Sequence, residues 1–269
     1  MPDTTFPPDW QPQRDFGDGR IGFHLADRIA TVAIQIPHKL NALDEPATAG
    51  LVAALDHAQL EGARVLILTG IGGKSFISGA DLRGFEGPRP TGTDFTDRQR
   101  ILAACPIPTI AVIRGYCIGG GLMTALNCDL RLASTDASFG IPATRLGLAY
   151  GPEGTRRLME AVGPARAKRL LFVGDRVDAQ TALNWGLIEH LYAPEALWPA
   201  AMDMARQIAA NAPLSVQATK EIVADLSKDA PDRDPARIAE IARACRASHD
   251  FREGRDAFRE KRPPVFEGR

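Results

Sequence analysis

The sequence predicts an α/β fold in which buried strands alternate with helices. Two apolar runs of strand length, at residues 64–70 (RVLILTG) and 109–115 (TIAVIRG), lack the alternation of polar residues seen in half-exposed strands. Such runs are typical of parallel strands that helices cover on both faces. Glycine-rich turns and helical spacings follow both runs. The length of 269 residues is sufficient for one large domain with a substantial core.

The composition is that of an ordinary globular protein. Hydrophobic residues make up 45% of the chain and charged residues 24%, which excludes wholesale disorder and collagen-like repeats. The formal net charge of −1 argues against a general nucleic-acid or membrane-surface binder. The chain has 25 glycines and 20 prolines but only 6% aromatic residues, so it is rich in turns and small side chains.

The four cysteines show no metal-binding spacing. Cys105, Cys117, Cys128 and Cys245 lie in apolar or helical contexts and form no CxxC motif. This usage favours reduced, buried thiols in a cytosolic protein, and we expect no metal site. The N-terminus lacks the pattern of a signal peptide, and no stretch approaches the roughly 18 unbroken apolar residues of a membrane span. We therefore expect a cytoplasmic protein with no membrane partner.

The first part of the chain predicts a leader, a hairpin and a helix. Residues 1–19 are rich in Pro, Asp and Gly and indicate a loose leader. Apolar runs at 21–26 and 29–36, separated by a two-residue Asp-Arg turn, are typical of a β-hairpin. The segment 41–62 has apolar residues at helical spacing and ends on a glycine, which is a common helix stop.

The middle of the chain repeats a strand, a glycine-rich turn and a short helix. The strand at 64–70 leads into 79–85, and the strand at 109–115 leads into 119–127. A further apolar run at 128–134 predicts another strand. Residues 84–97 are rich in Gly, Pro, Thr and Asp and predict a surface loop.

The pattern changes near residue 194. From there it is helical almost throughout, with breaks at a proline near 213 and at prolines around 231–235. We therefore expect an α/β core at 20–193 and a helical C-terminal part at 194–269.

Several familiar motifs fail on their context. Residues 17–22 match GxGxxG, but they precede a strand, whereas a dinucleotide-binding fingerprint follows one and opens a helix. Residues 72–75 (GGKS) resemble the end of a P-loop but lack its first glycine and its helix. No GxSxG nucleophile elbow occurs in the chain.

Two glycine-rich turns are the strongest candidates for chemistry. They lie at 78–82 and 115–121, each expected to end a buried strand and begin a helix. A helix N-terminus has free backbone N–H groups and the positive end of a dipole, and glycine lets a substrate approach them closely. Two such turns facing each other could form an oxyanion hole. The alternative is that these glycines only permit tight strand–helix packing, and the residues alone leave both interpretations open.

Five segments together resemble the enoyl-CoA hydratase/isomerase (crotonase) superfamily. The resemblance implies a ClpP-like spiral of ββα units, with C-terminal helices that assemble a homotrimer or a dimer of trimers. It also implies an acyl-CoA thioester as substrate, and no separate cofactor because coenzyme A is part of that substrate. The segments are FISGADL (76–82), IRGYCIGGGLMTALNCDLRLAS (113–134), FGIPATRLGL (139–148), AKRLLFVGDRVDAQTALNWGLIEHL (167–191) and REGRDAFREKRPP (252–264).

The resemblance assigns roles to particular residues. The oxyanion-hole N–H groups of the family map onto Ala80 and Gly120, within the two turns described above. These groups polarise the thioester carbonyl and stabilise an enolate. The residues that would contact coenzyme A are Ala80, Asp81 and Leu82 at the adenine, Lys39 at a phosphate, and Phe258 and Lys261 reaching a neighbouring subunit. For Phe258 and Lys261 the alternative is an ordinary amphipathic helix.

The chain departs from the hydratases at both of their catalytic acids. The first hydratase glutamate falls at Met123 and the second at Ala143. Neither side chain can move a proton, so efficient two-glutamate hydration is in doubt.

One acid remains close to these positions. Glu153, in the segment GPEG, resembles the single glutamate of superfamily isomerases that move a 3-enoyl double bond to the 2-position. A lone carboxylate beside an apolar wall suits this proton transfer, because burial raises its pKa. The alternative is an acid in the first turn of a helix, interacting with the dipole.

Tyr150 supports a second interpretation. A tyrosine at a similar place occurs in methylmalonyl-CoA decarboxylases of the superfamily, whose first step needs no general base. Those enzymes usually have histidine at the position of Ala80, and Tyr150 is also explained as a packed loop aromatic. We favour enoyl-CoA isomerisation with Glu153 as base, with hydration, decarboxylation and non-catalytic binding of CoA esters as alternatives.

Overall fold

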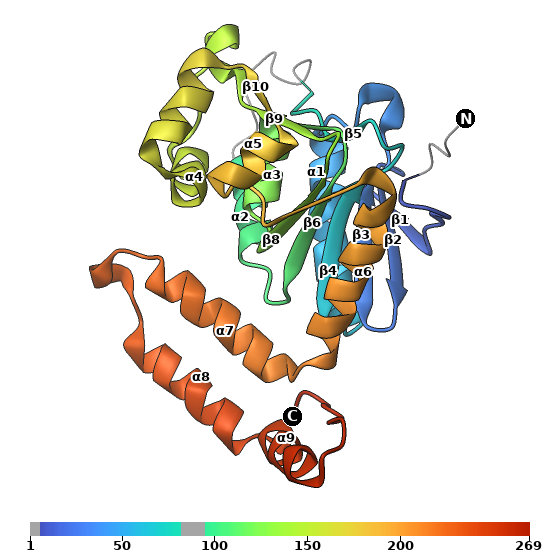
Figure 1. The fold of residues 1–269 in the computed structure, drawn as a ribbon, viewed down its shortest axis with the longest axis vertical. Coiled ribbons are helices and arrows are strands. Elements are labelled where there is room, and N and C mark those ends of the chain that lie inside the picture. Colours follow the sequence, from blue (N-terminus) through green and yellow to red (C-terminus); the bar gives the residue numbers. More distant parts are fainter. Residues whose placement is uncertain (1–5, 82–94) are drawn as a thin grey trace.

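The computed structural model describes residues 6–81 and 95–269, and the strands in these stretches form two sheets (Figure 1). The large sheet has seven strands in the spatial order β1 (Arg14–Phe16), β2 (Ile21–Ala26), β3 (Ile29–Ile34), β4 (Val65–Gly70), β6 (Thr109–Ile113), β8 (Leu130–Ser134) and β11 (His190–Tyr192). The small sheet has the order β10 (Arg176–Asp178), β9 (Ser138–Gly140), β7 (Tyr116–Ile118) and β5 (Ser75–Ile77). From β3 to β11 the large sheet is parallel.

Helices flank both sheets and form the C-terminal part of the chain, so the predicted α/β class is confirmed. In chain order they are α1 (Glu45–Leu60), α2 (Phe95–Ala103), α3 (Gly120–Leu126), α4 (Pro152–Val173), α5 (Ala179–Trp185), α6 (Pro194–Ala210), α7 (Pro213–Leu226), α8 (Pro235–Ala247) and α9 (His249–Glu260).

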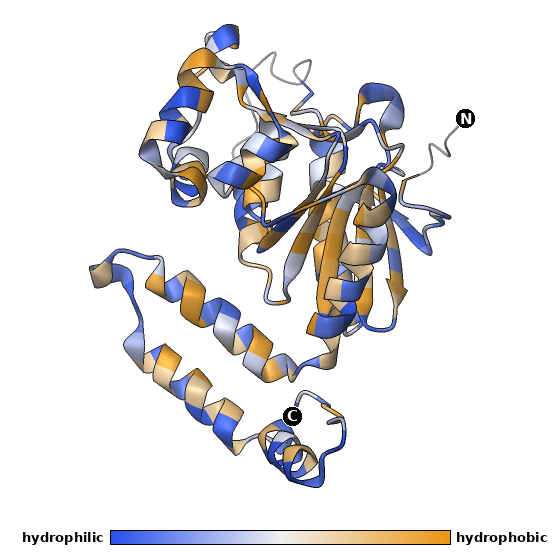
Figure 2. Cartoon of the chain, viewed as in Figure 1, coloured by the Kyte–Doolittle hydropathy of each residue, from blue (hydrophilic) through white to orange (hydrophobic). Residues whose placement is uncertain are grey.

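Side chains of the central strands alternate between two apolar layers. In β4, Leu66 and Leu68 join α1 in one buried cluster, whereas Val65 and Ile67 join α6 in another. Figures 1 and 2 show these two helices on opposite faces of the large sheet, whose strands are strongly apolar. A strand covered on both faces has no solvent side, which explains why the sequence predicted it from an unbroken apolar run.

The N-terminal segment is more ordered than expected. The predicted hairpin is confirmed as β2 paired antiparallel with β3. However, β1 lies within the supposed leader and extends this hairpin. Phe6 is buried and packs edge-on against Trp198 of α6, with ring centroids 5.9 Å apart. From residue 6 onward the leader is therefore part of the fold, because its aromatic side chain covers apolar surface.

A helical C-terminal part begins at Pro194, as expected, but its first helix, α6, packs on the large sheet as part of the core. The next three helices, α7, α8 and α9, extend away from the large sheet (Figure 1). The predicted loop at 84–97 lies mostly outside the described residues, and its last residues, 95–97, begin α2. None of the helices in the described stretches is long and apolar enough to cross a bilayer.

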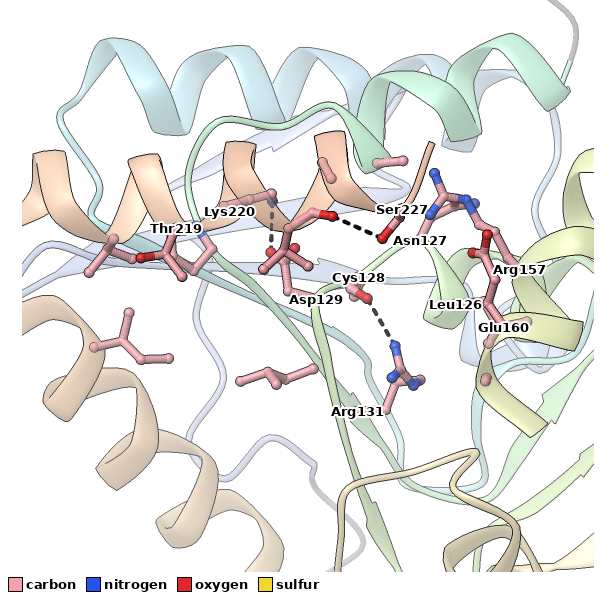
Figure 3. A pocket seen from close by; sticks show the side chains of 18 of the residues that line it. Leu126, Asn127, Cys128, Asp129, Arg131, Arg157, Glu160, Thr219, Lys220 and Ser227 are labelled. Carbon is pink, nitrogen blue, oxygen red and sulfur yellow. Dashed lines mark hydrogen bonds and ion pairs between the residues drawn. The ribbon is translucent and has the colours of Figure 1, made fainter. Parts of the chain in front are cut away.

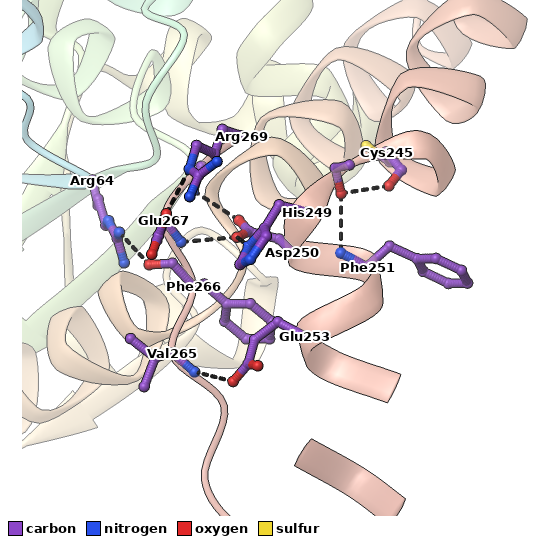
Figure 4. A network of polar contacts seen from close by, with 12 residues as sticks. Arg64, Cys245, His249, Asp250, Phe251, Glu253, Val265, Phe266, Glu267 and Arg269 are labelled. Carbon is purple, nitrogen blue, oxygen red and sulfur yellow. Dashed lines mark hydrogen bonds and ion pairs between the residues drawn. The ribbon is translucent and has the colours of Figure 1, made fainter. Parts of the chain in front are cut away.

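Polar contacts hold the C-terminal helices in place. Lys220 Nζ of α7 lies 2.7 Å from Asp129 Oδ2 at the start of β8. Arg64 donates to the carbonyl oxygen of Phe266 at 2.6 Å, which fastens the C-terminal tail to the core. In Figure 4 the buried carboxylate of Asp250 accepts backbone N–H groups of this tail. The tail also contacts α9, where the Glu253 carboxylate accepts a hydrogen bond from the Val265 N–H.

The small sheet depends on one close contact with α3. A Cβ atom added to Gly121 would lie 2.1 Å from the carbonyl oxygen of Ile77, the last residue of β5. This approach is possible only for glycine, because backbone atoms cannot yield as a flexible side chain can. Gly121 therefore allows the first turn of α3 to rest directly on the end of β5.

We predict that Gly121→Ala lowers the free energy of unfolding by about 3 kcal/mol or more, because the added methyl group must displace backbone. The measurement is urea denaturation. Gly151→Ala is the matched control, since Gly151 has φ −62° and open space around it. We expect the control to change stability by less than about 1 kcal/mol. Equal effects of the two changes would contradict the importance of this contact.

The tail also predicts an acid-dependent opening. Arg262 binds the Glu253 carboxylate and the Val265 N–H donates to it, which lowers the pKa of Glu253 from 4.5 to about 2. When the pH is above the pKa that Glu253 has in the open tail, the ionised carboxylate stabilises the closed tail. This stabilisation is lost as the pH falls through the lower pKa of the closed tail. Hydrogen-exchange protection of residues 262–268 should therefore decrease between pH 4.5 and about 2.

Two variants separate this effect from general acid unfolding. Glu253→Gln should remove the transition, because a neutral amide binds Arg262 weakly at every pH. Glu260→Gln removes the other carboxylate on Arg262 and leaves the Glu253 contacts intact, so it should keep the transition. A wild-type transition in Glu253→Gln would refute the assignment.

Candidate active site

The two glycine-rich turns lie at one edge of the small sheet. The first follows β5, whereas the second, predicted at 115–121, contains the short strand β7 and is a turn only at 119–121. β5 and β7 are parallel neighbours with Ile77 opposite Cys117. The carboxyl ends of parallel strands meet at the same edge, so the turns lie side by side. A Cβ atom added to Gly79 in the first turn would lie 3.5 Å from the Ile118 carbonyl oxygen, which is the end of β7.

The first turn is not helical as far as it is described, through Asp81, and the rest of the helix expected at 79–85 lies outside the described residues. Ala80 forms a parallel bridge with Leu43, in which the Leu43 N–H donates to Gly79 O at 2.9 Å and the Asp81 N–H donates to Leu43 O at 2.8 Å. Successive peptide groups of an extended segment point to opposite sides. The Ala80 N–H therefore faces away from Leu43, and it has no backbone acceptor among the described residues.

The second turn does begin a helix, as predicted. Gly120 is the first residue of α3, so its N–H has no partner within the helix. Gly119 before it has φ 54° and ψ −114°, a conformation open only to glycine. The described part of the chain offers no backbone acceptor to the Gly120 N–H. Two backbone donors that have no backbone acceptor among the described residues thus lie in neighbouring turns.

An apolar wall adjoins the second turn. A Cβ atom added to Gly154 would lie 2.3 Å from Met123 Cε and 2.7 Å from Tyr150 Cε1, so the first turn of α4 presses on both side chains. Burial raises the pKa of the Tyr150 phenol, which keeps the hydroxyl protonated. That hydroxyl lies 3.5 Å from the Gly119 carbonyl oxygen and donates to it. Ala143 packs against the core, so both hydratase acid positions are apolar.

Glu153, which precedes Gly154 in the first turn of α4, is paired with a cation. Glu153 Oε2 lies 2.7 Å from Nε of Arg100 on α2, and the Glu153 side chain is 25% exposed. Hydrogen bonding to Glu153 raises the pKa of Arg100. The lone carboxylate of the sequence analysis therefore has a cationic partner, and its role as a base stays a prediction. Arg100 escaped the sequence analysis because it belongs to a different helix, 53 residues away along the chain.

The expected coenzyme A contacts fall into three groups. Lys39 Nζ and Asp81 Oδ2 lie 3.6 Å apart, so the structure brings these two residues together beside the first turn. Leu82 lies outside the described residues. Phe258 is 88% exposed on α9 and Lys261 caps that helix, at the opposite end of the molecule from the turns (Figure 1). Their contact with a neighbouring subunit stays a prediction.

A separate cavity of about 730 Å³ lies between the end of α3, β8 and α7. Figure 3 shows Lys220 reaching across it toward Asp129. None of the described residues of the two glycine-rich turns lines this cavity. Within residues 6–81 and 95–269, no group of three or more His, Cys, Asp or Glu side chains is arranged to hold a metal ion.

Known proteins match this chain over most of its length. The profile of the enoyl-CoA hydratase/isomerase family matches residues 25–269. The (E)-benzylidenesuccinyl-CoA hydratase of Thauera aromatica is 38% identical, over 92% of this chain and 99% of that protein. The crotonyl-CoA hydratase of Syntrophomonas wolfei is 33% identical, over 89% of this chain and 95% of that protein.

Solved structures agree with the sequence relatives. The crystal structure of an enoyl-CoA hydratase/carnithine racemase from Magnetospirillum magneticum has a TM-score of 0.87 and 30% identity, covering 93% of this chain and 96% of that one. This similarity confirms the predicted crotonase-type α/β fold. On profile, sequence and structure together, the chain belongs to the enoyl-CoA hydratase/isomerase family.

Proposed function

We propose that the two turns bind the carbonyl of an acyl-CoA thioester and stabilise its enolate through the N–H groups of Ala80 and Gly120. The observation that carries this proposal is the pair of unpartnered backbone donors at the ends of two adjacent parallel strands. Such donors are fixed before substrate binds, so they stabilise developing charge without reorganisation. Loss of one of them typically costs about 3–4 kcal/mol of transition-state stabilisation.

The reaction that fits the surrounding groups best is isomerisation of an enoyl-CoA double bond. Glu153 removes a proton from C2 of a 3-enoyl thioester, and the electron pair moves onto the thioester oxygen. The enolate then collapses, the double bond forms between C2 and C3, and the same carboxyl group returns the proton at C4. Arg100 binds one carboxylate oxygen of Glu153, which leaves the other oxygen to accept the proton.

Coenzyme A itself would bind along the first turn. Lys39, Asp81 and Leu82 would contact the phosphate and adenine groups, with Lys39 supplying the positive charge. Phe258 and Lys261 would reach the coenzyme A of a neighbouring subunit in a trimer or a dimer of trimers. Because coenzyme A is part of the substrate, the reaction requires no separate cofactor.

Two alternatives have specific support. The similar proteins named above are hydratases, which favours hydration, although Met123 and Ala143 replace the acids that would activate water. The Tyr150 hydroxyl beside Gly119 favours decarboxylation, which needs an oxyanion hole but no base in its first step. Binding of CoA esters without catalysis is the remaining alternative.

We predict that the protein exchanges the C2 protons of a saturated acyl-CoA with D₂O, because enolate formation requires no double bond. Proton NMR measures this exchange. Glu153→Gln should slow it at least about a hundredfold, the usual contribution of a general base. Glu160→Gln on the same helix, whose carboxylate pairs with Arg156, should leave the rate unchanged. Exchange unaffected by Glu153→Gln would remove this residue from the mechanism.

A panel of 3-enoyl, 2-enoyl and malonyl-type CoA thioesters distinguishes the reactions. We expect conversion of the 3-enoyl to the 2-enoyl thioester, because one base serves both proton transfers. Chromatography of the thioesters measures this conversion. Conversion of the 2-enoyl thioester to a 3-hydroxyacyl product would instead establish hydration. Release of CO₂ from the malonyl-type thioester would establish decarboxylation. Either of these results, with the 3-enoyl thioester left unchanged, would contradict isomerisation.

A further inference from the structure

A buried polar network connects α2 to the helix that begins at Gly120. It consists of Gln99 on α2, Thr124 on α3 and Asn127 just after α3. Their exposed fractions are 3%, 0% and 6%, so water does not compete for their hydrogen bonds. Polar side chains this deeply buried are costly unless they are paired, and here each side chain has at least one hydrogen bond to another member of the network. One atom, Asn127 Oδ1, has no partner among the described residues.

The hydrogen bonds of this network run in one direction. Asn127 Nδ2 donates to Gln99 Oε1 at 3.1 Å, and Gln99 Nε2 donates to Thr124 Oγ1 at 3.0 Å. Because Thr124 Oγ1 accepts from Gln99, its single hydrogen is left to donate to the Gly120 carbonyl oxygen at 2.9 Å. The chain of donors therefore ends on the residue that carries the proposed oxyanion donor.

Fixing this carbonyl matters because three consecutive glycines form the turn. Glycine has wide backbone freedom, so the direction of the Gly120 N–H must be set by contacts. The Gly119 carbonyl, in the same peptide group as that N–H, accepts from the Met123 N–H at 3.1 Å and from Tyr150 at 3.5 Å. With Thr124 on the next carbonyl, both peptide groups that flank Gly120 are held.

The helix that supplies Gln99 is itself firmly placed. Arg98 donates to the Glu45 carbonyl oxygen at 2.9 Å and to Thr48 Oγ1, both on α1. Arg100 pairs with Glu153 on α4. Three consecutive residues of α2 thus contact three different helices, and the middle one contacts α3.

We propose that Gln99 is a positioning residue that aims the Gly120 N–H at the substrate oxygen through Thr124. This inference rests on the proposed oxyanion hole. Stability alone does not require the network, because Asn127 Oδ1 is left without a partner among the described residues and apolar side chains of similar shape can replace buried polar groups at little cost. A hydrogen-bonded chain differs from apolar packing in fixing direction, and direction is what an oxyanion donor needs.

The test uses hexanoyl-CoA labelled with ¹³C at the thioester carbonyl. Infrared difference spectra report how strongly the bound carbonyl is polarised, and NMR reports the rate of C2 exchange in D₂O. We expect Gln99→Met to reduce the shift of the carbonyl band to lower wavenumber and to slow exchange about tenfold or more. The dissociation constant of hexanoyl-CoA should change little, because the side chain does not touch the ligand.

Three further variants keep the proposal open to refutation if Gln99→Met fails to fold. Thr124→Val, which keeps the shape and removes the hydroxyl, should reproduce both losses, and Thr124→Ser should retain wild-type values. Arg98→Met, the matched control on α2, should lower the melting temperature without changing either signal.

The outcomes separate this inference from the proposed function. Wild-type carbonyl shift and exchange in Gln99→Met and Thr124→Val would overturn the positioning role and leave the oxyanion hole standing. Equal losses in Arg98→Met would overturn it too, because they would show a general effect of destabilising α2. Absence of any shift in the wild-type protein would refute the oxyanion hole, and the positioning role with it.

Discussion

The close approach of α3 to the end of β5 is the constraint on which the site depends. Only because Gly121 has no side chain can the first turn of α3 lie against the Ile77 carbonyl. This contact keeps the end of β5 beside the turn that follows β7. The two unpartnered N–H groups of the proposed oxyanion hole are neighbours as a consequence of backbone packing, before any side chain takes part.

Because the proposed oxyanion donors are backbone groups, the surrounding side chains need not include the two acids of a hydratase. Where two acids would be expected in a hydratase, Met123 and Ala143 provide apolar surface. The remaining acid, Glu153, is tied to Arg100 from α2. The same helix reaches Gly120 through Gln99 and Thr124, so α2 contacts both the proposed base and the proposed oxyanion donor. The short helix α2 therefore contacts the residue proposed for proton transfer and, through Thr124, the residue proposed to stabilise the enolate.

Patterns along the chain predicted the large sheet well and the small sheet poorly. The buried strands β3, β4 and β6 follow from continuous apolar runs, because each is covered on both faces. Strands β5 and β7 have only three residues each and adjoin glycine-rich turns, so no periodicity identifies them. The extended conformation around Ala80 was missed for a related reason, since it depends on a bridge to Leu43 from a distant part of the chain.

Some residues of the candidate site could likewise be predicted from the sequence and others could not. Glycines at strand ends identify the two turns, because Gly121 makes a close backbone approach and Gly79 has φ 132°, a conformation that other residues rarely adopt. The partners on α2 could not be predicted, since Gln99 and Arg100 look like ordinary polar residues of a surface helix until the fold places them against α3 and α4. Sequence alone therefore identifies the proposed main-chain donors but not the side chains that orient them.

The most direct measurement is a crystal structure with a non-reactive acyl-CoA thioester bound. The thioester oxygen should lie about 2.7–3.1 Å from the backbone nitrogens of both Ala80 and Gly120, the range expected for an oxyanion hole. A thioester carbonyl that contacts neither nitrogen, or an acyl-CoA seated in the cavity beside α7, would contradict the assignment of these two turns as the catalytic centre.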